Sequence, residues 1–165
     1  MQGAGAWLRR RAENVAAAML AAMFAAFVLQ VAFRYLLNFP VGWTSELSVV
    51  LWLWLILWGA AFVVREGEEV RFDLLTAAAP RPVRMAMGIV AAVALIVLYG
   101  ASLPASWKYV AFMKVEKSAY LKIRMDWLYS IYLVFLVAML ARYLWLLWQL
   151  LRGREPEDAP PGSGL

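Results

Sequence analysis

The chain has 165 residues, of which 65% are hydrophobic and 15% aromatic, and it carries a formal net charge of +5. Soluble domains are usually about 45–50% apolar, so this composition indicates a membrane protein and argues against a soluble domain. The sequence contains no Cys and no His. This excludes disulfides, iron–sulfur clusters, His-ligated haem or zinc, and catalysis by a thiolate or an imidazole.

Four apolar segments are long enough to cross the hydrocarbon core of a bilayer, which needs about 20 residues. We expect membrane spans at about residues 15–33, 47–64, 85–103 and 127–151. They predict an all-α integral membrane protein in which residues 1–151 form a single four-helix membrane domain. The first segment follows three arginines but ends without a small-residue cleavage site, so we interpret it as a retained helix rather than a signal peptide.

The distribution of Lys and Arg predicts that both termini are cytoplasmic. With that orientation the cytoplasmic side carries nine basic residues outside the spans: Arg9, Arg10, Arg11, Arg65, Arg71, Arg81, Arg84, Arg152 and Arg154. The opposite side carries six: Arg34, Lys108, Lys114, Lys117, Lys122 and Arg124. This bias follows the positive-inside rule. Because the basic residues are dispersed over loops, they indicate topology and lipid contact rather than nucleic-acid binding.

Two segments outside the spans carry predictions of their own. In EEVRFDLLTAAAPRP, apolar residues recur at helical spacing opposite a charged face. This pattern predicts a short amphipathic helix in the membrane interface, with a solvated loop as the alternative. Residues 152–165 are rich in Pro and Gly and are predicted to form a disordered cytoplasmic tail. Between the third and fourth spans, part of a basic segment is expected to continue the third helix beyond the bilayer.

The turn FRYLLNFPVGWTSE joins the first two spans. Arg34 ends the first span and Glu46 begins the second, so both lie on one side of the membrane, where an ion pair could fix the hairpin. Thr44 or Ser45 can cap the second helix, and Glu46 suits its positive N-terminal end. Docking of a partner protein is the alternative role for Arg34 and Glu46.

The centres of the four spans contain no carboxylate. Transporters usually show themselves by ionisable residues near the bilayer midplane, so we expect no catalytic, cofactor or metal site and no transport path in this chain. Trp52, Trp54 and Trp58 lie inside the second span, and we expect them to pack against lipid or another membrane protein.

A specific family resemblance starts from the same turn. Arg34, Asn38 and the run Trp43–Glu46, followed by a Trp-rich helix ending in Gly59–Ala60–Ala61, resemble the first two helices of one membrane subunit. This is the small membrane subunit of tripartite ATP-independent periplasmic (TRAP) transporters.

Two later segments extend the resemblance. The family's motif H-V-x-V-D-L is similar to Glu69–Leu74 here, with Glu69 in place of the usual His. The start of the family's fourth helix, S-x-x-L-x-I-P-x-W, resembles the segment from Ser118 to Trp127, with Arg124 where Pro is common.

The resemblance implies a non-enzymatic scaffold in the bacterial inner membrane, packed beside a large elevator subunit that binds substrate and Na⁺. A periplasmic binding protein would deliver an organic acid to that large subunit. The assembly residues that we infer are Arg34, Asn38, Trp43, Glu46, Gly59 and Asp73. We hypothesise that the binding protein docks on Lys108, Lys114, Lys117, Lys122 and Arg124.

Two other classes of protein stay open. A small proton-coupled multidrug exporter also has four short spans, but it needs a membrane-embedded carboxylate, for which Glu13, at the entrance of the first span, is the only candidate in the first helix. A scaffold of an unrelated membrane complex would likewise lack a catalytic site and would have a different partner.

Overall fold

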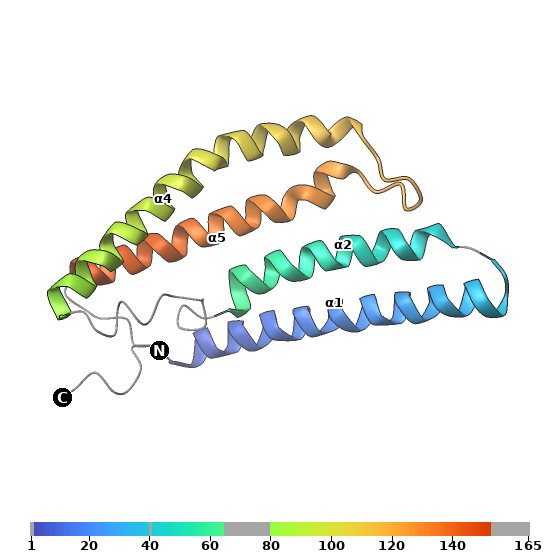
Figure 1. Ribbon diagram of the computed structural model, residues 1–165, viewed down its shortest axis with the longest axis horizontal. Coiled ribbons are helices and arrows are strands. Elements are labelled where there is room, and N and C mark those ends of the chain that lie inside the picture. The colour runs from blue at the N-terminus through green and yellow to red at the C-terminus, as the bar shows by residue number, and fades with distance from the viewer. Residues whose placement is uncertain (1, 40, 65–79, 153–165) are drawn as a thin grey trace. The chain divides into compact units, whose positions relative to one another are not determined.

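The computed structural model of the protein describes residues 2–39, 41–64 and 80–152. Four long helices account for most of these residues (Figure 1): α1 (Gln2–Leu36), α2 (Gly42–Trp58), α4 (Arg81–Phe112) and α5 (Met125–Leu151). A five-residue π-helix, Gly59–Val63, continues α2, and a short 3₁₀ turn, Met113–Val115, follows α4. Within the described residues, four helices are long and apolar enough to cross a membrane, which confirms the predicted all-α membrane class.

The helices extend further than the predicted spans. α1 begins at Gln2 rather than near residue 15, and α4 runs through Pro104 to Phe112, so the third helix does continue past residue 103 as predicted. α2 begins at Gly42, with Val41 at the N-cap position and no side-chain cap. The expected capping by Thr44 or Ser45 is therefore wrong. Instead, their hydroxyls donate to the carbonyls of Val41 and Gly42 at 3.0 and 2.8 Å.

Most of the apolar surface of these helices is exposed. The most apolar stretch of each candidate span is between 0% and 28% buried. Phe24 and Val49, for example, expose 68% and 64% of their surface. Such exposure is unfavourable in water, where each Å² of apolar surface costs roughly 25 cal/mol, and it is the normal condition of a helix that faces lipid.

The described helices fall into two compact units. The first contains α1, α2 and the π-helix together with Ser106–Phe135, and within it α1 and α2 lie antiparallel, side by side (Figure 1). The second contains α4 as far as Ala105 and α5 from Leu136 onward. There the rings of Tyr99 and Tyr143 stack with their centroids 6.0 Å apart.

Several predictions concern residues outside the described ranges. The predicted amphipathic interfacial helix, within residues 68–82, lies outside the described residues as far as residue 79, together with the motif residues Glu69 and Asp73. Nearly all of the predicted tail, residues 153–165, also lies outside the described residues.

Candidate functional site

Glu46 links the start of α2 to a distant part of the first unit. Its Oε2 atom accepts hydrogen bonds from the backbone N–H of Tyr120, at 2.7 Å, and of Leu121, at 3.3 Å. These donors lie 74 and 75 residues further along the chain. Hydrogen bonds from backbone N–H groups to a carboxylate are among the stronger kinds in proteins. The α1–α2 hairpin is thereby joined to the connection between α4 and α5.

The donors belong to a short hairpin, Glu116–Met125, which we call the 116–125 loop. The N–H of Met125 donates to the Glu116 carbonyl at 3.0 Å, and that of Ser118 donates to the Ile123 carbonyl at 2.9 Å. Lys122, near the tip, has a φ of 54°. This left-handed conformation turns the chain, so that two consecutive N–H groups face Glu46.

Ser118 organises the interior of the 116–125 loop. It is only 3% exposed, and its hydroxyl accepts the N–H of Ile123 at 3.1 Å. Ser118 therefore stabilises the loop whose N–H groups bind the Glu46 carboxylate.

Gly42, the first residue of α2, lies directly beneath the ring of Tyr120. A Cβ atom at position 42 would lie 2.2 Å from Cζ of Tyr120, which is much closer than any real contact. Only glycine therefore accommodates the ring in its present position. Neither Gly42 nor Tyr120 was predicted as a site residue, because no local sequence pattern relates residues so far apart.

Two of the predicted assembly residues, Asn38 and Arg34, have structural roles at the C-terminal end of α1. Asn38 has a φ of 50°, and the following N–H, of Phe39, donates to the Phe33 carbonyl at 3.0 Å. Asn tolerates this left-handed conformation better than most residues. Arg34 lies in the last turn of α1, where a cation is favourable. The ion pair suggested between Arg34 and Glu46 is absent from the described residues, since Glu46 binds the 116–125 loop instead.

The three tryptophans of α2 serve two different surfaces. Trp54 donates its indole N–H to the Leu128 carbonyl at 3.0 Å, and Trp58 donates to the Ala12 carbonyl at 3.1 Å. Both bonds lie inside the first unit, so the expectation of lipid or partner contact was incomplete for this pair. Trp52 points the other way and is 55% exposed.

Trp52 belongs to an exposed stripe that we call the α2 outer face, formed by Val49, Trp52, Ile56 and Gly59. These residues lie at helical spacing along one side of α2 and the start of the π-helix. The first three are 64%, 55% and 48% exposed. A Cβ on Gly59 would meet no atom within 4 Å. Trp43, near the start of α2, is 38% exposed.

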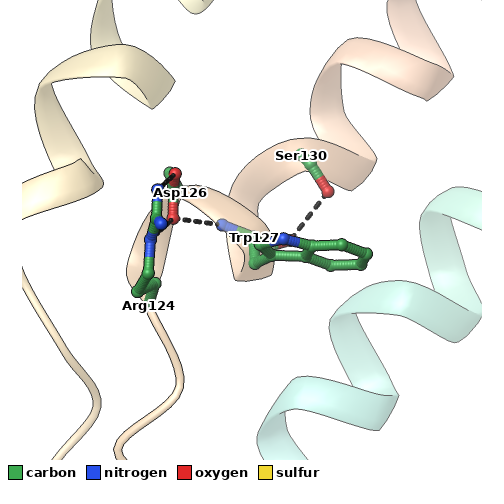
Figure 2. Close-up of polar contacts among 4 residues, drawn as sticks. All are labelled: Arg124, Asp126, Trp127 and Ser130. Carbon is green, nitrogen blue, oxygen red and sulfur yellow. Dashed lines mark hydrogen bonds and ion pairs between the residues drawn. The ribbon is translucent and has the colours of Figure 1, made fainter.

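The predicted docking residues differ in whether their side chains already form a hydrogen-bonded ion pair within the chain. Lys108, Lys114, Lys117 and Lys122 are all exposed. Arg124 instead forms a two-fold contact with Asp126, at 3.1 and 2.5 Å (Figure 2). This pairing raises the pKa of Arg124 above its usual value. Asp126 also accepts the N–H of Trp127 at 2.9 Å, so that one carboxylate orients both Arg124 and the first turn of α5.

Glu13 is engaged locally. It pairs with Arg9 of the same helix at 2.8 Å, and its side chain is 42% exposed. A carboxylate that exchanges protons inside a membrane would be expected in a shielded position. Within the described ranges, no group of three acidic side chains is placed to hold a metal ion.

Known proteins resemble the chain over most of its length. Residues 23–153 match the family model described as "Tripartite ATP-independent periplasmic transporters, DctQ component". The sialic acid TRAP transporter small permease protein SiaQ of Vibrio cholerae is 27% identical over 54% of this chain and 51% of its own length. The C4-dicarboxylate small permease protein DctQ of the same species is 30% identical over 59% of this chain and 42% of its own length.

A third relative, the C4-dicarboxylate TRAP small permease protein DctQ of Pseudomonas aeruginosa, is 34% identical over 41% of this chain and 32% of its own length. The matched segment thus spans about half of SiaQ and less of each DctQ protein. The family match covers both the turn with Asn38 and Glu46 and the 116–125 loop. The chain belongs to the DctQ family, the small permease subunits of TRAP transporters.

Proposed function

We propose that this subunit is a scaffold that packs beside a large elevator subunit during Na⁺-driven uptake of an organic acid. A periplasmic binding protein delivers the acid, and the large subunit carries out its translocation across the membrane. The observation that carries this proposal is the division of α2 into two faces. One face is bonded to the rest of the chain through Trp54 and Trp58, and the other is left open.

The α2 outer face suits a large apolar partner. Trp52 and Ile56 offer a broad surface, and Gly59 adds a point at which another helix backbone can approach closely. Polar residues that would bind a soluble ligand are absent from this stripe, which consists of Val, Trp, Ile and Gly. In this proposal the large subunit covers the stripe, and the 116–125 loop holds α2 at the required angle.

Affinity purification of the tagged chain from its native membrane tests this assignment. Gly59→Leu adds a side chain where the isolated subunit has open space, and Gly59 has a helical φ of −58°, so the subunit itself should fold normally. Overpacking an interface should reduce recovery of the large subunit by about fivefold or more. Gly100→Leu is the matched control, because that position is equally open. Equal recovery with both variants would reject the α2 outer face.

The binding protein is proposed to dock on the basic residues of the periplasmic side. In this orientation both termini are cytoplasmic, and the 116–125 loop faces the periplasm of the bacterial inner membrane. Lys117 and Lys122 are its best candidates, since both are exposed and lie on an ordered hairpin. Replacing them with Glu should weaken capture of the binding protein and slow uptake. Unchanged uptake would restrict the loop to a structural role.

The orientation has its own test. The sequence contains no Cys, so a single Cys introduced at Lys122 is the only thiol in the chain. A membrane-impermeant maleimide added to spheroplasts should label it without lysis. Labelling that requires lysis would invert the proposed topology.

A further inference from the structure

A groove lies between the last turns of α4 and the first turns of α5, inside the first unit. Its volume is about 360 Å³, within the range of ligand pockets, roughly 300–1,000 Å³. Trp107 and Ala111 line it from α4, and Asp126, Trp127, Ser130 and Leu133 line it from α5. None of these residues is assigned a role in the proposed function.

The groove has a polar end and an apolar end. α4 and α5 run in opposite directions here, so Ala111 lies near Asp126 at the loop end, and Trp107 lies nearer Leu133. The candidate span in α5 begins at Met125. The loop end of the groove is therefore at headgroup level, and the other end reaches toward the hydrocarbon.

Two exposed tryptophans support this placement of the groove at the membrane interface. Trp107 and Trp127 are 65% and 66% exposed, one on each wall. Exposed tryptophans gather where lipid headgroups meet acyl chains. The groove therefore has the apolar walls and the depth that one lipid molecule requires.

The charge at the polar end selects the headgroup. The segment from Lys114 to Asp126 contains four basic residues and two acidic ones, Glu116 and Asp126. Asp126 is already engaged by Arg124, whose side chain remains 45% exposed. Lys114 adds a second positive charge to the surroundings of Asp126. The local excess of charge near this end of the groove is therefore positive.

We propose that this groove binds one anionic phospholipid. Its phosphate lies at Arg124 and Lys114, and one acyl chain follows the groove between Trp107 and Leu133. The lipid occupies the hollow between two helix ends and adds apolar contacts across it. A helix of another membrane protein is the competing occupant, and the experiment below separates the two.

Native mass spectrometry of the purified full chain in mild detergent tests the site. The probes are phosphatidylglycerol and phosphatidylcholine with identical acyl chains. The first lipid adduct should favour phosphatidylglycerol by about fivefold, the effect expected of one basic side chain near an anionic headgroup. Ala111→Trp should fill the groove and abolish the preferred adduct. Ala141→Trp is the control, because Ala141 is also exposed but lies on α5 away from the groove.

A second variant tests the headgroup contact. Arg124→Gln should reduce the preference for phosphatidylglycerol while a single phosphatidylcholine adduct persists. Equal binding of the two lipids by the wild-type chain would overturn the proposal. So would an Ala111→Trp chain that keeps its preferred adduct but no longer recovers another membrane protein, since the groove would then seat that partner.

Discussion

The two ends of the α1–α2 hairpin each carry a glutamate, and the two glutamates act differently. At the turn end, Glu46 accepts backbone N–H groups 74 and 75 residues away. At the other end, Glu13 pairs with Arg9, four residues earlier on the same helix. The first contact joins separate segments of the fold, and the second connects only two residues of the same helix. Residue type alone does not distinguish them.

The difference follows from which groups would lose a hydrogen-bond or ion-pair partner if each carboxylate were removed. Without Glu46, the N–H groups of Tyr120 and Leu121 would lose a charged acceptor, and the N–H of Leu121 would lose it in a part-buried position, which is costly. Without Glu13, Arg9 remains exposed to water, which solvates it well. The turn end is therefore the end at which substitutions should have consequences.

The largest effect is expected for Glu46→Ala. It should release the 116–125 loop, which contains three sites for trypsin: Lys117, Lys122 and Arg124. Cleavage there should accelerate by about tenfold or more, as expected when charge-assisted hydrogen bonds are lost. Limited proteolysis in detergent measures this rate. Glu46→Gln, which retains an acceptor oxygen, should lie between Glu46→Ala and the wild type; a wild-type rate for Glu46→Ala would show that the contact does not hold the loop.

The next effect concerns the glycine beneath Tyr120. Gly42→Ala should lower the free energy of unfolding by at most about 1 kcal/mol, the low end of the range for overpacking, because its Cβ would displace only the ring end of Tyr120, a side chain that is 65% exposed. In a Tyr120→Ala background the same substitution should cost little. Thermal unfolding of the wild type, the two single variants and the double variant measures the coupling between Gly42 and Tyr120. Equal costs in both backgrounds would show that the ring does not require glycine.

Replacement of the tryptophans compares the two faces of α2. Trp54→Phe should lose one hydrogen bond and about 0.5–1.5 kcal/mol of stability, and Trp58→Phe should behave alike. Trp52→Phe should leave the stability of the isolated subunit unchanged, because Trp52 is exposed. Thermal unfolding in one detergent measures all three. A loss at Trp52 as large as the other two would remove the distinction between the faces.

The smallest effect is expected for Glu13→Gln. Exposed ion pairs of this kind contribute about 0.3–0.5 kcal/mol, so the melting temperature should barely change. The variant should also leave cationic-dye efflux by the chain at the background level. Dye efflux by the wild type that Glu13→Gln abolishes would instead favour a proton-coupled exporter.

Much of the fold was accessible from the sequence, because lipid-facing helices carry long apolar runs that need no knowledge of their neighbours. Asn38 has a left-handed backbone and Glu46 a long-range hydrogen bond within the chain, and their role in assembly stays a prediction. What could not be predicted depends on contacts between distant segments. Nothing near Glu46 indicates Tyr120 as its partner, and Trp54 and Trp58 have no local feature that separates them from Trp52. The observed helix ends also differ from the predicted ones, since α2 starts at Gly42 without a capping side chain.

The most direct test of the scaffold assignment is photo-crosslinking from the α2 outer face in native membranes. The sequence has no Cys, so Trp52→Cys labelled with a benzophenone maleimide places one reactive group there. Trp145→Cys is the control, since Trp145 is 58% exposed on α5. The account predicts an adduct with a large membrane protein from position 52 that is absent or much weaker from position 145. Lipid adducts alone from position 52, or equal protein adducts from both positions, would contradict it.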